Sequence, residues 1–196
     1  MKILTSIVLA LMLFGCATVT PPPAPTAAPM HVTAPPAYTA NEATRLMLCM
    51  SMADNAMTIA TYKVAGKSID EVKALYRQGP QSTLTLALVD KVYGENISHT
   101  WDYTVSFYKE CAVNMANIPP PRSDMATYCM QNVLIASTAY NLKAAGLPKE
   151  TTYKRFDKMG ETPKHIVDEV YGQSGTRAEV TLKTWNSCMA PLTANY

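Results

Sequence analysis

The chain has 196 residues, of which 48% are apolar and 16% are charged, and its formal net charge at pH 7 is +2. This length is typical of one domain or of two small ones, and the charged fraction lies below the roughly 25% of ordinary soluble domains. The nearly balanced charge argues against a nucleic-acid-binding protein, because there is no excess of lysine and arginine to neutralise phosphates. The five cysteines are an odd number, so at least one of them lies outside any internal set of disulfides.

Residues 1–15 have the pattern of a secretory signal peptide. Lys2 supplies a positive charge, residues 3–14 are mostly apolar, and the small residue Gly15 follows them. This order of charge, apolar core and small residue is typical of a signal that is removed after export. The apolar run is shorter than the roughly 20 residues that a membrane-spanning helix needs. We therefore expect an exported protein.

The end of this segment, Leu13-Phe14-Gly15-Cys16, resembles the lipobox of bacterial lipoproteins, although Phe14 departs from the small or β-branched residue usual at its position. The resemblance covers only the first 17 residues. It implies that Cys16 is lipidated and becomes the N-terminus, so that several acyl chains anchor the protein in a membrane. Ala17, rather than Asp, implies the outer membrane, with the body facing the periplasm. The alternative is ordinary cleavage after Ala17, which gives a soluble periplasmic protein.

Residues 16–40 form a predicted tether. From residue 17 onward this stretch contains seven Pro, seven Ala and five Thr and no charged residue, a composition that cannot bury enough apolar surface to offset its ordering entropy. Its prolines favour extended polyproline II, a semi-rigid spacer of about 3.1 Å per residue. We expect a spacer that holds the body at most about 70 Å from the membrane.

The remaining sequence is interpreted as a tandem duplication, with repeats at 41–117 and 118–196. Short matching segments occur in the same order in both halves, and the offset between them shrinks only from 80 to 77 residues along the chain. The matches are Cys49-Met50 with Cys129-Met130, Lys63 with Lys143, Gly66 with Gly146, Val92-Tyr93-Gly94 with Val170-Tyr171-Gly172, and Cys111 with Cys188.

Each repeat has helical patterns, so the body is predicted to be all-α, as two small duplicated helical bundles. Apolar residues at helical spacing predict a helix over 42–65, ended by a glycine. Capping boxes open helices at Ser68 and Thr176. Thr162 is expected as an N-cap followed by Pro163 at the first helical position, and Gly94 and Gly172 are expected to cap the ends of the helices that contain Tyr93 and Tyr171. Residues 82–93 alternate partly like a strand, but helix is favoured there. The last helices are predicted over 98–114 and 177–190.

Four cysteines remain for the body if Cys16 is the anchor, and they allow three sets of pairs. An exported protein favours disulfides, and a duplicated unit should carry its own bridge. We therefore expect one intra-repeat disulfide in each half. No Cys-x-x-Cys motif indicates redox catalysis. The expected pairs are Cys49–Cys111 and Cys129–Cys188.

Residues that could support other chemistry are few. Clustered methionines suit Cu(I), but methionine also fills irregular cores, so copper binding is an alternative and core packing the favoured interpretation. The two histidines of the body lack the spacing of a zinc site, and no nucleophile or phosphate-loop motif is present. Two acidic residues match between the repeats but are expected on solvated helix faces. The clustered methionines are Met47, Met50, Met52 and Met57, the two histidines are His99 and His165, and the two matched acidic residues are Asp90 and Asp168.

The best candidate for a partner-binding patch is an aromatic group formed by Trp101, Tyr103 and Tyr108, because Trp and Tyr are favoured anchors in interfaces. Together these features predict a membrane-anchored periplasmic lipoprotein that acts as a non-catalytic interaction or assembly accessory of the cell envelope. We expect an envelope protein as its partner, with no cofactor, no metal and no nucleic acid. The alternatives are a carrier of a small ligand or of copper between helices and, third, an enzyme.

Overall fold

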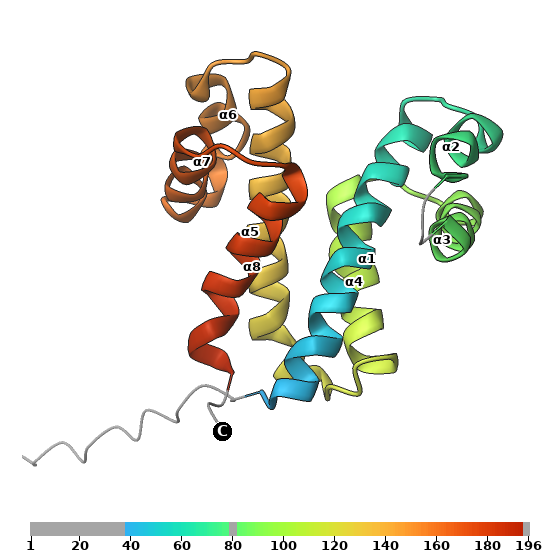
Figure 1. The fold of residues 1–196 in the computed structure, drawn as a ribbon, viewed down its shortest axis with the longest axis horizontal. Coiled ribbons are helices and arrows are strands. Elements are labelled where there is room, and N and C mark those ends of the chain that lie inside the picture. Colours follow the sequence, from blue (N-terminus) through green and yellow to red (C-terminus); the bar gives the residue numbers. More distant parts are fainter. Residues whose placement is uncertain (1–37, 79–81, 194–196) are drawn as a thin grey trace, which may run out of the picture. The chain divides into compact units, whose positions relative to one another are not determined.

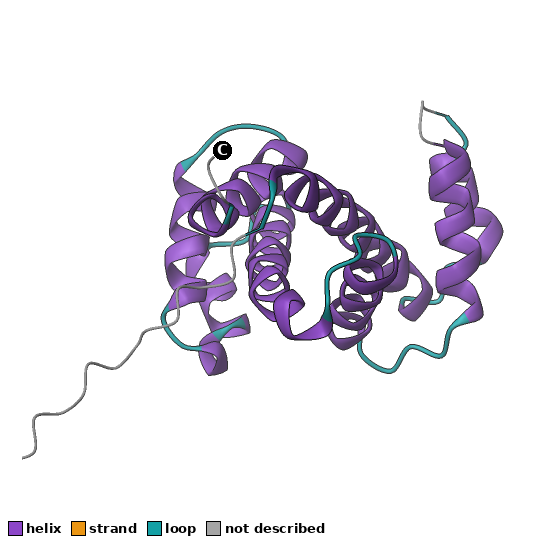
Figure 2. Cartoon of the chain, turned by 90° about the horizontal axis from the view of Figure 1, so that it is seen from below, coloured by secondary structure: helices purple, strands orange, loops and turns teal. Residues whose placement is uncertain are grey.

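The computed structural model describes residues 38–78 and 82–193, all of which belong to one compact unit. The signal segment at 1–15, the lipidation candidate Cys16 and most of the predicted tether lie outside these residues. Within them every regular element is helical, as Figure 2 shows, which confirms the all-α prediction and the helix predicted near 82–93. None of the described helices is both long and apolar enough to cross a membrane. The elements are α1 (Ala40–Val64), α2 (Ile69–Tyr76), α3 (Ser82–Gly94), α4 (Thr100–Asn114), α5 (Pro120–Ala144), α6 (Lys149–Arg155), α7 (Thr162–Gly172) and α8 (Arg177–Met189), with 3-10 turns at Asp157–Met159 and Ala190–Leu192.

The longer helices form two pairs. Helix α1 packs against α4, and α5 packs against α8, while the shorter helices α2 and α3 lie beside the first pair and α6 and α7 beside the second (Figure 1). The α4–α5 contact, with a smaller contact between α1 and α5, joins the pairs. One continuous core therefore contains residues of both predicted repeats, among them Leu46 from the first and Met130 and Trp185 from the second. A second, smaller core lies under α6 and α7, around Phe156 and Val170.

Local sequence signals account for the ends of the helices. Ser68 and Thr176 form the two predicted capping boxes, in which the Ser or Thr side chain and a glutamate three residues later each satisfy a backbone N–H. A third box at Thr39 opens α1 and was not predicted. Gly66 and Gly146 have φ values of 83° and 76°, so they end α1 and α5 in the left-handed region as expected.

Two details of the expected helix ends are wrong. Gly94 and Gly172 are the last residues of α3 and α7 and do not end these helices in the left-handed region. Thr162, expected as an N-cap, is already the first helical residue of α7, and its predecessor makes no side-chain cap. Proline in the first turn fixes φ there, which suffices to open the helix without a capping side chain.

Both expected disulfides are present. Cys49 in α1 bonds Cys111 in α4, and Cys129 in α5 bonds Cys188 in α8, with Cα–Cα distances of 5.6 and 5.5 Å. Cys49, Cys111 and Cys129 are buried, and Cys188 packs partly buried against the same core. Each disulfide joins the first long helix of its half to the last, so it closes a loop of about 60 residues and limits how far the two helices can separate.

A lysine contact recurs at equivalent places in the two halves. The ammonium of Lys63 donates to the carbonyls of Val92 and Tyr93 at the end of α3, over 3.2 and 2.9 Å. The ammonium of Lys143 donates to the carbonyls of Val170 and Gln173 at the end of α7, over 3.0 and 2.6 Å. The last carbonyls of a helix lack intrahelical partners and carry its negative dipole end. Both lysines therefore hold a short helix against a long one.

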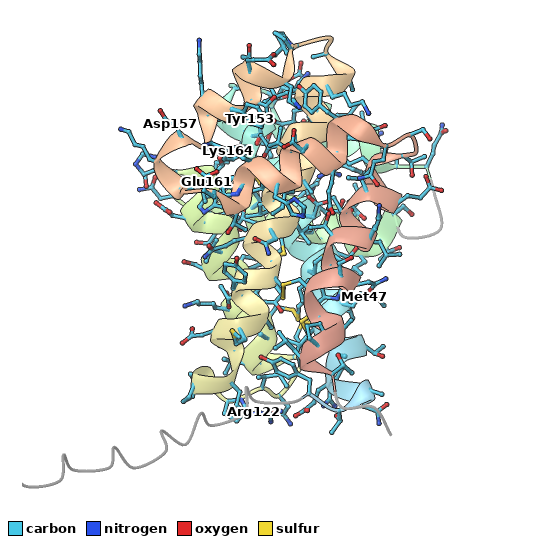
Figure 3. The ribbon with its side chains drawn as sticks, turned by 90° about the vertical axis from the view of Figure 1, so that its left-hand side faces the viewer. Met47, Arg122, Tyr153, Asp157, Glu161 and Lys164 are labelled. Carbon is cyan, nitrogen blue, oxygen red and sulfur yellow. A yellow bond between two sulfur atoms is a disulfide. The ribbon has the colours of Figure 1, made fainter. Side chains whose placement is uncertain are left out.

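The predicted tether ends earlier than residue 40. Tyr38 is fully buried, its N–H donates to the Leu192 carbonyl over 2.7 Å, and its hydroxyl donates to the Arg122 carbonyl. Arg122 in turn stacks over the Tyr38 ring and donates two hydrogen bonds to Glu42, of 2.9 and 3.0 Å. Arg122 lies at the end of the bundle opposite Tyr153 of α6 (Figure 3). Tyr38 was counted in the tether because its neighbours have the composition of a spacer, yet its aromatic ring is part of the core.

Candidate functional site

A groove between α1 and α8 has a volume of about 690 Å³. Its walls combine apolar side chains of both helices, including Met47 and Met50 of α1, with polar ones such as Ser51 and Thr181. Leu48 of α1 and Leu182 of α8 also line it and remain 48% and 42% exposed, so two large apolar side chains stay accessible to a ligand. Cavities of this size are typical of small-molecule sites.

At one end of this groove, a buried ion pair joins α1 to α8. Arg177 donates to Asp54 over 2.6 Å, to the Thr58 hydroxyl over 3.2 Å and to the Ser137 hydroxyl over 2.9 Å. The Asp54 side chain is only 10% exposed and that of Arg177 is 27% exposed. These bonds join three helices, because Asp54 and Thr58 lie on α1, Ser137 lies on α5 and Arg177 lies on α8. Together they hold the guanidinium in one position. The pair also connects the two halves of the chain.

The environment of Asp54 raises the pKa of its carboxyl above the usual value. Burial is the main cause, since it removes water from the charged form. The positive charge of Arg177 and the Ser137 hydroxyl act in the opposite direction and offset part of this effect. Arg177 is the partner of Asp54 in the core, and the contact uses part of the donor capacity of the arginine.

A second cavity, of about 530 Å³, lies between α1 and α5 and shares Arg177 with the groove. Its lining differs, because it is rich in groups that donate or accept hydrogen bonds. Arg155, the last residue of α6, supplies a second guanidinium to it. Its other polar lining residues are Thr58, Thr61, Tyr62, Ser137, Thr138 and Asn141.

The methionines expected to pack in the core, or alternatively to bind Cu(I), do not converge on one point. Met50 is buried and Met47, Met52 and Met57 pack partly buried against the same core. Met47 and Met50 line the α1/α8 groove, whereas Met52 lines a separate apolar cavity beside α3 and α4, and Met57 lines the polar cavity. Their spacing along α1 places them on different faces, so core packing accounts for them.

The aromatic candidates do not form one surface. Tyr108 is fully buried, packed edge-on against Trp185 at 6.1 Å, so its assignment to a partner-binding patch is wrong. Trp101 and Tyr103 are half-buried; Trp101 contacts Phe156 across the two halves. The face of α4 that carries Tyr108 packs toward the core, and helical spacing alone does not say which aromatic face turns inward.

The remaining candidates lie apart from one another on the surface. Asp90 pairs with Lys73 at 2.5 Å and Asp168 with Lys149 at 2.6 Å, as expected for solvated faces. His165 lies 3.6 Å from Glu169 on the same helix, and His99 precedes α4 without capping it. The described residues contain no group of three or more His, Cys, Asp or Glu that could hold a metal ion.

Apart from Met47 and Met50, the residues of the groove were not predicted from the sequence. Asp54 was detectable in part, since it interrupts a run of Met and Ala on the buried face of α1, where an unpaired charge would be costly. Arg177, Leu48 and Leu182 carry no local signal. Comparison with protein-family models, with curated proteins and with solved structures finds no match to this chain.

Proposed function

We propose that this chain is a membrane-anchored, periplasm-facing lipoprotein that acts as a non-catalytic binding accessory of the cell envelope, and that it binds its ligand in the α1/α8 groove. The observation that carries this proposal is the groove itself, which is about 690 Å³ in volume, combines exposed apolar side chains with polar ones, and has the Asp54–Arg177 pair in its lining. A cavity with an apolar wall and a few fixed polar groups is the usual form of a binding site.

The construction of the body supports a binding role. The two disulfides brace the α1–α4 and α5–α8 pairs on either side of the groove. A braced frame lowers the ordering cost of binding, since little structure has to form when the ligand arrives. The recurrence of the lysine contact and of the disulfide supports the further proposal that the two halves arose by duplication, with the groove between them.

Two kinds of ligand, a small molecule and a protein partner, are considered for this groove. The volumes of the two adjoining cavities favour a small ligand. A protein partner is the second candidate, and the exposure of Leu48 and Leu182 favours it, because an amphipathic helix can lay its apolar side chains in such a groove. The burial of Tyr108 removes part of the surface on which a protein partner was first expected.

Photo-crosslinking in cells tests the groove directly. A photoreactive residue is placed at Leu182 and, separately, at Leu75 of α2, which is 57% exposed and does not line the groove. We expect a defined adduct at Leu182, whose mass distinguishes a small molecule from a protein, and none at Leu75. The same products at both positions, or none at Leu182, would contradict the proposed site.

The anchor is tested separately by mass and fractionation. The intact mass of the protein extracted without reductant should show acyl chains on Cys16 together with two disulfides, and Cys16→Ser should release the protein from the membrane fraction. An unacylated mature chain that begins after Ala17 would favour the soluble periplasmic alternative.

A further inference from the structure

Arg177 lines two neighbouring cavities whose linings differ in degree. The α1/α8 groove exposes the large apolar side chains of Leu48 and Leu182, whereas the α1/α5 cavity has more hydroxyl, amide and guanidinium groups, beside Met57 and Leu142. A ligand that fills both must itself have an apolar part joined to a polar part.

The charges of the two cavities indicate the sign of the polar part. Their lining residues include three arginines, Arg45, Arg155 and Arg177, against one carboxylate, Asp54. Asp54 is buried and already bonded to Arg177, so it offers little to a cationic ligand. The excess positive charge favours an anion.

We propose that the protein binds a single-chain amphiphile with an oxyanion head group, either phosphate or carboxylate. The head group lies in the polar cavity between Arg155 and Arg177, and the hydrocarbon chain lies in the groove between α1 and α8. This inference rests on the proposed function, because it names the ligand of the same groove.

The chemistry of the polar cavity suits such a head group. A guanidinium donates hydrogen bonds in a fixed planar arrangement that matches carboxylate and phosphate oxygens. Arg177 is fixed by its bonds to Asp54 and Ser137, so its remaining donor capacity is preorganised. Thr138 and Asn141 add neutral donors around the same space.

The shape of the groove suits one hydrocarbon chain. Its lining on α1 extends from Thr44 to Asn55 and on α8 from Arg177 to Leu182. From Thr44 to Asn55 the helix rises by about 17 Å. An adjoining cavity shares Thr44 and Met47 with the groove and continues past Trp185 to Thr193, so the space is elongated along the helices.

The test uses calorimetric titration of the full exported chain carrying Cys16→Ser, so that no acyl chain of its own competes. Four probes with the same twelve-carbon tail are compared below their micelle concentrations: dodecyl phosphate, tridecanoate, dodecyltrimethylammonium and dodecyl maltoside. We expect both anionic probes to bind at least about tenfold more tightly than the cationic and neutral ones. Inorganic phosphate alone should bind far more weakly than dodecyl phosphate, because it lacks the tail.

Matched variants distinguish an effect of the proposed site on affinity from an effect of the overall charge of the protein. Arg155→Gln should weaken the anionic probes by about tenfold, the effect of one charge-assisted hydrogen bond, whereas Lys154→Gln, the same charge change one residue earlier, should not. Leu182→Asn should weaken every probe, and Leu75→Asn should weaken none. All four residues are exposed, so the variants should fold, which circular dichroism verifies.

Equal affinities for the four head groups, or equal losses in Arg155→Gln and Lys154→Gln, would overturn the inference. A protein adduct at Leu182 in cells without binding of dodecyl phosphate would overturn the ligand class and leave the proposed groove in place. Binding of dodecyl phosphate without any adduct at Leu182 in cells would instead contradict the proposed function.

Discussion

Arg177 and Asp54 lie 123 residues apart in the sequence, yet their side chains meet at 2.6 Å and join α8 to α1. Their contact links the two halves of the chain at the place where the apolar groove meets the polar cavity. The same residue pair therefore matters both for how the halves stay together and for what they can bind.

Removing one partner of this pair should be costly. Asp54→Ala leaves the Arg177 guanidinium half-buried without its carboxylate, and we expect a loss of about 1 to 3 kcal/mol in the free energy of unfolding. Asp54→Asn retains an acceptor oxygen for Arg177 and should lose less. Urea denaturation of the two variants measures the difference; equal losses would mean that the hydrogen bond to Arg177 contributes nothing.

The Glu42–Arg122 pair should make stability depend on acid pH. The hydrogen bonds from Arg122 and from the Thr39 backbone lower the pKa of Glu42 to about 2, from the 4.5 of an unperturbed glutamate. Because the folded-state pKa is lowered, ionised Glu42 stabilises the fold above about pH 4.5, and this contribution is lost as the pH falls through about 2. We expect Glu42→Gln to be less stable than the parent by about 1 to 2 kcal/mol at pH 7.

Denaturant midpoints measured from pH 7 to pH 2 check this expectation. The curves of the parent and of Glu42→Gln should converge at the acid end. Glu161→Gln is the control, because Glu161 is 85% exposed and its pair with Lys164 should contribute little. A constant difference between the parent and Glu42→Gln across the whole range would show that ionisation of Glu42 is not involved.

The two disulfides should stabilise the fold to a similar extent. They close loops of 62 and 59 residues, for which the chain-entropy model gives about 4 kcal/mol each as an upper figure. The double variants Cys49→Ala/Cys111→Ala and Cys129→Ala/Cys188→Ala should therefore lose comparable amounts in denaturant titrations. If free thiols are found in the unreduced parent protein, this pairing is refuted.

The recurring lysine contact predicts matched effects in the two halves. Lys63→Met and Lys143→Met each remove donors from the last carbonyls of a short helix, and each should lose about 1 kcal/mol of unfolding free energy. Lys154→Met, on an exposed position of α6, should have almost no effect. Thermal or urea unfolding of the three variants gives the comparison. A large loss in one half and none in the other would weaken the proposed duplication.

Much of the fold could be predicted because its signals are local or repeated. The capping boxes at Ser68 and Thr176 and the glycine at 66 act within a few residues, and the matched cysteines identified the disulfides. The position of Tyr38 could not be predicted in this way. The composition of residues 16–40 describes the segment on average and does not show that one aromatic side chain within it packs in the core.

The groove could not be predicted, because it depends on how distant helices pack. Nothing near Arg177 in the sequence indicates that Asp54 lies beside it, and Leu48 and Leu182 are ordinary residues until α1 and α8 are placed together. The burial of Tyr108 could not be predicted for the same reason, since it depends on the packing of Tyr108 against the distant residue Trp185.

The central claim is that the space around Arg177 is a ligand site, and a crystal structure of the Cys16→Ser chain with dodecyl phosphate tests it most directly. We predict the phosphate between Arg155 and Arg177 and the alkyl chain along the groove between α1 and α8. Dodecyl phosphate bound elsewhere, with the groove empty or filled by the protein's own side chains, would contradict the claim.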